Sequence, residues 1–235
     1  HITAIRHAAL ATAGAGVCGG RRRFAGRVCA LYPACIFGEF GRSTLGLFLT
    51  VTIVSLPPSP WVQRWSHLVP AGGAVLDVAC GTGRHVRWFA ERQHPVTGID
   101  RSPEAIAALH QMAATLPITV IDADIEDGPW PLPGQQFAAV VVTNYLWRSL
   151  LPTLVASLAP GGVLIYETFA MGHETIGKPS RPDFLLQPGE LLAACAALRV
   201  VAYEDGFIET APRFVQRIAA VRPNPSAELP RYRLV

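Results

Sequence analysis

The chain has 235 residues, half of them apolar, which is enough for one sizeable α/β domain with a buried core. Its five cysteines are scattered without a CxxC pair, so they argue against a disulfide framework or a zinc site and fit a reducing cytoplasm. The formal net charge of +3 is unevenly spread: residues 1–60 contain six Arg and one Glu, whereas residues 61–235 contain 14 basic and 16 acidic residues. The larger part therefore lacks the basic balance of a nucleic-acid-binding domain.

Residues 1–58 differ in character from the rest of the chain, because they show neither helical nor alternating periodicity. We expect a disordered or non-native N-terminal extension there. Arg21–Arg23, followed by apolar residues, would also suit a targeting segment, and a small separate domain is a third reading. The uninterrupted apolar run Ser43–Leu56 is shorter than the roughly 20 residues of a spanning helix, so we expect no membrane association. Prolines at positions 57, 58 and 60 mark the boundary.

From residue 59 onward, short apolar segments alternate with helical patterns, beginning with a helix that Ser59 can cap. The patterns predict strands at 74–79, 95–100, 118–124, 137–144 and 161–169, and helices at 83–93, 102–116 and 146–158. Such alternation is typical of a parallel sheet that is covered on both faces.

The C-terminal part adds a loop over residues 170–187, a helix over 188–198 and two strands at 199–208 and 213–222. No helix separates these two strands, so they should form an antiparallel pair. The expected fold is α/β: a Rossmann-like, doubly wound seven-stranded sheet over residues 59–222, mostly parallel with an antiparallel C-terminal hairpin. Residues 223–235 would form a tail.

The stretch VLDVACGTGRH at residues 75–85 ends a buried strand with an acid and a glycine turn, as in nucleotide-type binding sites. A nicotinamide-binding turn needs G-x-G-x-x-G, but Val86 stands at the third glycine position after Gly81 and Gly83. Asp77 would also repel a pyrophosphate, which argues against a dehydrogenase. A cationic ligand without phosphates would suit the site, and S-adenosyl-L-methionine is such a ligand.

This stretch resembles motif I of the class I S-adenosylmethionine-dependent methyltransferases. The longer run DVACGTGRHVRWFAERQHPVTGIDRS is similar to the small bacterial tellurite-resistance-type methyltransferases, and the similarity covers residues 60–222. It implies S-adenosyl-L-methionine as the cofactor, no metal, and a small-molecule acceptor. Two positions depart from the wider pattern: Ala79 replaces the first glycine of the motif, and Ala138 replaces the acid before the fourth strand.

Three acids follow three adjacent strands, where ligands of open α/β sheets bind. The resemblance implies that Asp77 supports the methionine end of the cofactor, Asp100 accepts the ribose hydroxyls, and Asp124 bonds the adenine amino group. Asp122 is a competing candidate for the adenine contact, and Ile125 would cover the ring. The other residues expected at the cofactor are Ala79, Cys80, Gly81, Gly83, His85, Arg101 and Asn144.

The acceptor is expected beside the residues that follow the fourth and fifth strands. Tyr145 could line the cofactor, Arg148 could hold an anionic acceptor, and Glu167 could orient the acceptor or act as a base. The segment 170–190 is too long for a simple connector and is expected to act as a lid.

These features predict a cytoplasmic methyltransferase, a monomer or homodimer, that acts on a small molecule and binds neither nucleic acid nor membrane. The absence of an Asn-Pro-Pro-type motif after the fourth strand disfavours DNA amino groups and protein glutamine as acceptors. Two alternatives stay open: a non-catalytic cofactor-binding partner protein, and a methyltransferase acting on protein or RNA.

Overall fold

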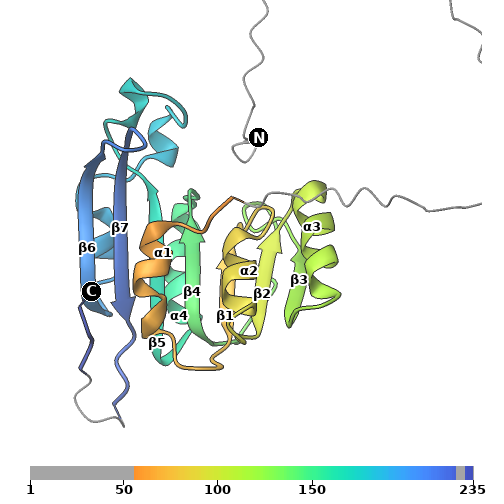
Figure 1. The fold of residues 1–235 in the computed structure, drawn as a ribbon. Helices are drawn as coiled ribbons and strands as arrows, with labels where there is room; N and C mark the ends of the chain where they lie inside the picture. The colour runs from red at the N-terminus through yellow and green to blue at the C-terminus, as the bar shows by residue number, and fades with distance from the viewer. Residues whose placement is uncertain (1–55, 226–230, 235) are drawn as a thin grey trace, which may run out of the picture. The chain divides into compact units, whose positions relative to one another are not determined.

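A computed structural model describes residues 56–225 and 231–234 of the chain, so the expectations for the N-terminal extension fall mostly outside the described residues. The described part contains a seven-stranded sheet in the order β3-β2-β1-β4-β5-β7-β6 (Figure 1). The strands are β1 (Val75–Val78), β2 (Val96–Asp100), β3 (Ile118–Asp122), β4 (Phe137–Thr143), β5 (Leu158–Phe169), β6 (Arg199–Ile208) and β7 (Arg213–Val221).

Strands β1 to β5 pair in parallel, whereas β7 runs antiparallel to both of its neighbours, β5 and β6. The expected mostly parallel sheet with an antiparallel C-terminal pair is therefore confirmed. Its central strands are buried on both faces, which is why β1 and β4 read as nearly continuous apolar runs.

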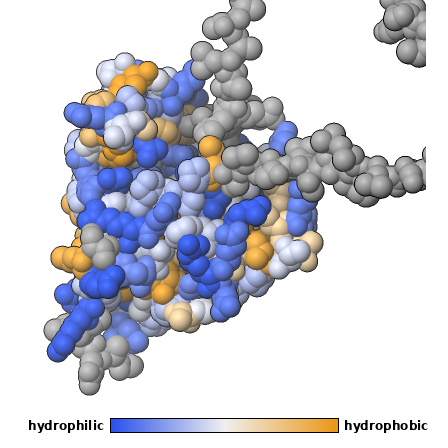
Figure 2. Space-filling view, viewed as in Figure 1, coloured by the Kyte–Doolittle hydropathy of each residue, from blue (hydrophilic) through white to orange (hydrophobic). Residues whose placement is uncertain are grey.

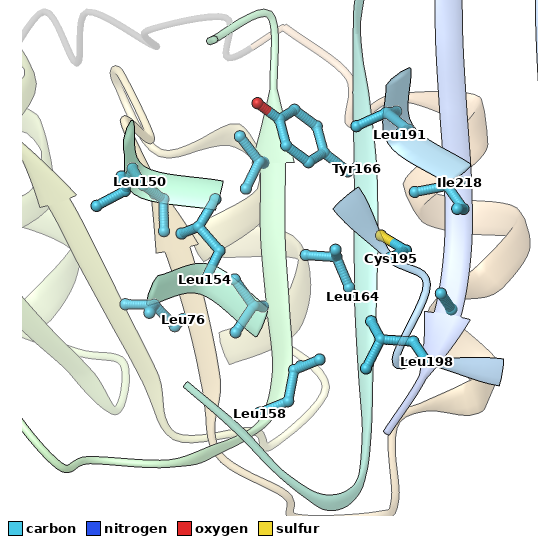
Figure 3. Packing of buried hydrophobic residues seen from close by; sticks show 14 of the residues in the cluster. Leu76, Leu150, Leu154, Leu158, Leu164, Tyr166, Leu191, Cys195, Leu198 and Ile218 are labelled. Carbon is cyan, nitrogen blue, oxygen red and sulfur yellow. The ribbon is translucent and has the colours of Figure 1, made fainter. Parts of the chain in front are cut away.

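Helices cover both faces of the sheet. The α-helices are α1 (Pro60–Trp65), α2 (Arg84–Ala90), α3 (Pro103–Ala113), α4 (Leu151–Ala156) and α5 (Glu190–Ala194). Apolar residues of α1, α2 and α3 share one core cluster, and those of α4 and α5 share the other. Figure 3 shows the second cluster, in which Leu154 and Leu191 lie against the sheet residues Leu76, Leu164 and Ile218. None of the helices in the described residues is long and apolar enough to span a membrane.

The helix starts follow the expected capping chemistry. The Ser59 hydroxyl accepts from the amide of Trp61 at the start of α1, and the Ser102 hydroxyl accepts from the amide of Ala105 at the start of α3. The helix expected over 146–158 is shorter than its pattern, because a 3-10 turn (Arg148–Leu150) precedes α4. Pro152 lacks an amide hydrogen and is accommodated in the first helical turn, so α4 begins at Leu151.

The C-terminal residues return to the body of the fold. Tyr232 packs against the cluster of α1, α2 and α3, and the carbonyl of Arg233 lies 3.0 Å from Nε2 of His67. The segment expected as a tail is therefore packed against the domain over residues 231–234.

The turn between β1 and α2 depends on Gly83, which adopts a left-handed φ of 80° at the start of α2. A Cβ at this position would lie 2.5 Å from Cε of Met112 and 2.7 Å from Cδ2 of Leu109. The missing side chain therefore lets the start of α2 pack directly on α3, which aims α2 at the carboxyl edge of the sheet.

We expect Gly83→Ala to destabilise the fold by about 2–4 kcal/mol, because it combines left-handed strain with overpacking. Gly134→Ala is the matched control: Gly134 has a φ of 75°, but its Cβ would meet nothing within 4 Å. The control should cost only about 1 kcal/mol. Urea denaturation measures both variants, and equal losses would show that close packing at Gly83 is unimportant.

Candidate active site

Polar side chains from four strands and two helices meet at the carboxyl edge of the sheet. Thr143 on β4 pairs with Glu167 on β5, and Glu167 pairs with Arg217 on β7. Asp77 on β1 lies level with Val141, two residues before Thr143, and so on the same face. Helices α1 and α2 begin over this face, so the four side chains form a row beneath them.

Asp77 is buried with 1% of its surface exposed, and neither carboxylate oxygen has a hydrogen-bond partner among the described residues. Burial raises its pKa to about 8, and the charge of Arg84 opposes this shift only in part. A buried, unpartnered carboxylate is costly and is normally matched by a cation or a donor. Asp77 therefore needs a ligand group.

The backbone beside Asp77 leaves room for such a ligand. Gly81 has a left-handed φ of 56°, and a Cβ built on it would meet nothing within 4 Å. Ala79, which stands at the first glycine position, also has a left-handed φ, of 51°. Side-chain-free backbone facing open space next to a buried carboxylate fits the cationic methionine end of S-adenosyl-L-methionine.

Asp100 holds this turn in place. Its Oδ2 accepts from the amide of Gly81 at 2.8 Å, and its Oδ1 accepts from the amides of Arg101 and Ser102 at 2.9 and 2.8 Å. Each carboxylate oxygen can accept two hydrogen bonds, so Oδ2 keeps one position for a ribose hydroxyl. Asp100 thus orders the glycine turn as well, which its place at the end of β2 does not reveal.

Asp124 organises the turn after β3. Its Oδ1 accepts from the amides of Glu126 and Asp127 at 3.0 and 3.2 Å, which lowers its pKa, and its Oδ2 accepts from Nη1 of Arg101 at 2.8 Å. This ion pair with Arg101 links the turn after β3 to the end of β2, where Asp100 lies. The competing candidate Asp122 is exposed on β3.

Glu167 is also buried, with 1% of its surface exposed, but it is surrounded by donors. Its Oε1 accepts from the Ser59 hydroxyl at 2.9 Å and lies 3.6 Å from Nη2 of Arg213. Its Oε2 accepts from Nη1 of Arg217 at 3.2 Å, and Arg217 also binds Glu204. These partners hold Glu167 as an anchored anion and argue against a role as a free base.

Two arginines that the sequence reasoning did not single out face this region. Arg84, the first residue of α2, donates from Nη2 to the Thr143 hydroxyl over a long 3.4 Å. Burial lowers its pKa, and it interacts electrostatically with Asp77, Glu167 and Arg213. Nε of Arg213 is buried and has no hydrogen-bond partner among the described residues. The alternation of Arg213 and Arg217 along a buried strand was the signal that could have revealed them.

Arg148 does not reach this row as a free cation. Its guanidinium donates to the Glu190 carboxylate at 2.7 and 3.0 Å and to the carbonyls of Asp183 and Leu185 at 2.6 and 2.9 Å. These bonds fasten the segment 183–190 to the turn before α4. Arg148 is therefore a clamp on the expected lid, and these four bonds use four of its five N–H donors.

The remaining expected residues line the same edge. Asn144 follows β4 with a left-handed φ of 54°, and its amide donates to the carbonyl of Glu167. The Tyr145 hydroxyl is buried next to Glu126, and burial raises its pKa. Burial likewise raises the pKa of the Cys80 thiol, so it is held as a neutral thiol. Ile125 is partly buried against the core. Their roles toward a ligand stay predictions.

The raised pKa of Asp77 predicts a pH-dependent stability. A carboxyl group with an ordinary pKa of 3.8 and a folded pKa of about 8 holds its proton longer in the folded state, so stability falls as pH rises between these values. His85 acts oppositely, because its pKa is lowered to about 3, but its contribution levels off as the unfolded-state ring loses its proton above pH 6.5. Between pH 6.5 and 8 the Asp77 effect is therefore the larger of the two.

In that window we expect the wild type to lose about 1 kcal/mol per pH unit relative to Asp77→Asn. The amide variant should also be more stable at pH 8 without ligand, because it buries no charge. Urea denaturation across the pH range measures the difference. Parallel pH profiles for the two proteins would contradict an Asp77 that titrates near 8.

Comparison with known proteins agrees with this geometry. Residues 75–162 match the family described as "Methyltransferase domain". Over 126 residues the chain is 30% identical to a putative methyltransferase, YqeM, of Bacillus subtilis, covering 47% of this chain and 48% of the relative. It is 33% identical over 99 residues to trans-aconitate 2-methyltransferase of Delftia acidovorans, covering 38% and 35%. The chain thus spans about half or less of these curated relatives.

Solved structures show the same fold at lower identity. TehB from Haemophilus influenzae superposes with a TM-score of 0.55 at 19% identity, over 69% of this chain and 61% of that one. A SAM-dependent methyltransferase from Methanosarcina mazei gives 0.57 at 16% identity, over 72% and 100%. The glycopeptide N-methyltransferase MtfA, solved with S-adenosylhomocysteine, gives 0.50 at 19% identity, over 69% and 88%. These matches give residues 75–162 as a methyltransferase domain, and the whole described fold resembles that of S-adenosylmethionine-dependent methyltransferases such as TehB.

Proposed function

We propose that this protein transfers a methyl group from S-adenosyl-L-methionine to a small anionic acceptor bound between α2 and β7. The observation that carries the proposal is the placement of Arg84 and Arg213: Arg84 donates to Thr143 on β4, and Arg213 lies near Glu167, the residue paired with Thr143 on β5. Their like charges repel each other across this edge. Arg213 keeps a buried Nε without a partner among the described residues, and its contact to Glu167 is a long 3.6 Å. Two neighbouring guanidinium groups, one of them with an unused donor, favour a carboxylate, a thiolate or an oxyanion.

The cofactor half of the site is assigned to the turn after β1 and to the ends of β2 and β3. Bound S-adenosyl-L-methionine supplies an electrophilic methyl group on a positively charged sulfur. Asp77 offers the matching negative charge, the bare backbone of Gly81 permits close approach, and Asp100 accepts a ribose hydroxyl. Asp124 and Ile125 follow β3, where the resemblance puts the adenine.

The acceptor half would act by positioning and by its positive charge. Methyl displacement needs the nucleophile held in line and shielded from water. Arg84 and Arg213 would stabilise the ionised form of an acceptor and orient it, so no separate base is required once the acceptor is an anion. Glu167, anchored by Ser59 and Arg217, would fix where Arg213 stands.

The segment between β5 and α5 would close this half. Arg148 clamps its far end, and its near end carries the exposed apolar residues Met171 and Ile176. Figure 2 shows apolar surface at the top of the molecule, where this segment lies in Figure 1. A small acceptor with an apolar part would fit such a border better than an extended polyanion.

The relatives differ in the acceptors for which they are named. The Delftia acidovorans relative is named for trans-aconitate, which is a polycarboxylate, and another for malonyl-[acyl-carrier protein]. Carboxylates therefore join thiols and chalcogen oxyanions as the first compounds to test.

Formation of S-adenosylhomocysteine tests the proposal directly. The purified chain is incubated with S-adenosyl-L-methionine and a panel of dicarboxylates, thiols, selenite and tellurite, with tRNA and a bacterial protein extract as competing acceptors. We expect turnover with at least one small anion. Turnover only with tRNA or protein would overturn the acceptor class, and tight cofactor binding with no turnover on any acceptor would favour a non-catalytic partner protein.

We expect Arg213→Gln to raise the KM for the acceptor about 10- to 100-fold, the cost of losing a charge-assisted hydrogen bond. The dissociation constant of the cofactor should change less than about twofold, because Arg213 lies on the acceptor side. Arg199→Gln is the matched control, since Arg199 is exposed on β6 and stacks on Tyr232. A normal KM in Arg213→Gln would remove Arg213 from the acceptor site.

We expect Asp100→Asn to weaken cofactor binding about 10-fold or more, because the ribose loses a charged acceptor. Asparagine is chosen because its side-chain oxygen can still accept a hydrogen bond from the turn. Alanine would leave all three backbone amides that bond Asp100 without an acceptor. Isothermal titration with S-adenosylhomocysteine measures the effect. Binding within twofold of wild type would show that Asp100 is not the ribose ligand.

A further inference from the structure

Ser59 lies just before α1, among three prolines, yet it is buried with 3% of its surface exposed. All of its polar groups are used. Its amide donates to Nε2 of His85 at 3.0 Å and its hydroxyl donates to Oε1 of Glu167 at 2.9 Å. The hydroxyl also accepts from the amide of Trp61, and its carbonyl accepts from the amide of Gln63. A helix cap needs only the last two bonds.

The other two bonds connect the two halves of the site. His85 stands in the first turn of α2, 26 residues away in sequence, beside Asp77 in the cofactor half. Glu167 ends β5, 108 residues away, in the acceptor half. Helix α1, which lies across β5 in Figure 1, holds Ser59 between them. Trp61 donates from its indole to the carbonyl of Ile218, which fixes the helix on β7.

The hydrogen bond from the Ser59 amide determines which nitrogen of the His85 ring carries the proton. Since Nε2 accepts a hydrogen bond, it carries no proton, so the proton of the neutral imidazole sits on Nδ1. Nδ1 faces Oδ2 of Asp77 at 3.9 Å. Burial, with the nearby charge of Arg84, lowers the pKa of His85 to about 3, so the ring stays neutral at physiological pH. The ring therefore presents N–H, and no positive charge, to the carboxylate.

The hydrogen bond from the Ser59 hydroxyl to Glu167 affects the distance between Glu167 and Arg213. Oε1 of Glu167 lies 2.9 Å from the Ser59 hydroxyl but 3.6 Å from Nη2 of Arg213. A carboxylate oxygen without the serine would draw the guanidinium closer, because a charge-assisted hydrogen bond is strongest below 3 Å. Ser59 takes one of the two acceptor positions of Oε1 and so competes with Arg213 for this oxygen.

We propose that Ser59 is a positioning residue of this methyltransferase: its hydroxyl keeps Arg213 available to the acceptor, and its amide keeps the His85 proton facing Asp77. The proposal rests on the proposed methyl transfer to an anion for its first part, and its second part concerns the free protein. Ser59 precedes the stretch that matches the methyltransferase family, which begins at residue 75. The segment before the family match thereby becomes part of the active site.

Kinetics of three serine variants test the role of the hydroxyl. In Ser59→Ala we expect the acceptor KM to rise about tenfold, the loss of one hydrogen bond to a charged group, with kcat and the cofactor dissociation constant within about twofold. Ser59→Thr keeps a hydroxyl and should restore most of the KM. Ser66→Ala is the matched control, because its hydroxyl caps the other end of α1 by donating to the carbonyl of Gln63. Thermal unfolding verifies that all three fold.

A purely structural role would give a different pattern. If Ser59→Ala raised the acceptor KM and the cofactor dissociation constant together, in step with a lower melting temperature, Ser59 would be only a helix cap and the proposal would fail. A normal acceptor KM in a folded Ser59→Ala protein would also overturn it.

Nuclear magnetic resonance of the ¹⁵N-labelled full chain tests the amide without any turnover. We expect the His85 ring as the Nδ1–H tautomer at pH 7, with a scalar coupling across the hydrogen bond from the Ser59 amide to Nε2. An Nε2–H tautomer or a charged ring would refute this part. If no small anion is methylated while the coupling is present, the proposed acceptor class fails and the Ser59–His85 link stands. If a small anion is methylated and the coupling is absent, the Ser59–His85 link fails alone.

Discussion

A carboxyl group buried at the end of β1 sets the conditions for the whole site. Asp77 lies in the centre of the sheet without a hydrogen-bond partner among the described residues, so its ionised form is unfavourable until a positive group arrives. Its neighbours stabilise the ionised carboxylate only in part. The positive charge of Arg84 attracts it, but the N–H of neutral His85 is too distant to form a hydrogen bond. Burial of Asp77 therefore lowers the stability of the free protein, and binding of a cationic ligand would recover this free energy as affinity.

The residues assigned to the cofactor and those assigned to the acceptor lie mostly in different parts of the sequence. The residues assigned to the cofactor lie within the stretch that matches the methyltransferase family, residues 75–162. Of the two residues assigned to the acceptor, Arg84 lies within that stretch and Arg213 follows it. Glu167 and Ser59, which position Arg213, lie after and before the stretch. The proposed methyl-donor site thus lies within the stretch that matches the family, whereas most of the proposed acceptor site is built from residues outside it. This division explains why the family match identifies the cofactor and leaves the acceptor to be argued from geometry.

The sheet could be predicted from sequence because each buried strand is a short apolar run with a clear turn signal beside it. Residues such as Asp77, Gly81 and Asp100 were recognisable because a strand, an acid and a glycine turn are adjacent in the chain. Glu167 was recognisable only as an acid at a strand end, and its partners could not be foreseen, since Ser59 and Arg217 reach it through pairing and packing across 108 and 50 residues. Arg148 was expected to hold an anionic acceptor. Its bonds to two loop carbonyls could not be foreseen, because they belong to a loop without sequence periodicity.

The reversed direction of β7 has a consequence for how such a site can change over evolution. Because β7 runs opposite to β5, its first residue, Arg213, lies at the same edge as the ends of the parallel strands. The short connection over residues 209–212 therefore lies next to the proposed acceptor half. Lengthening or shortening this hairpin would reshape the entrance for anions while the donor machinery on β1 and β2, three and four strands away in the sheet, keeps its geometry. Substrate range and methyl-donor binding can then be selected independently within one sheet.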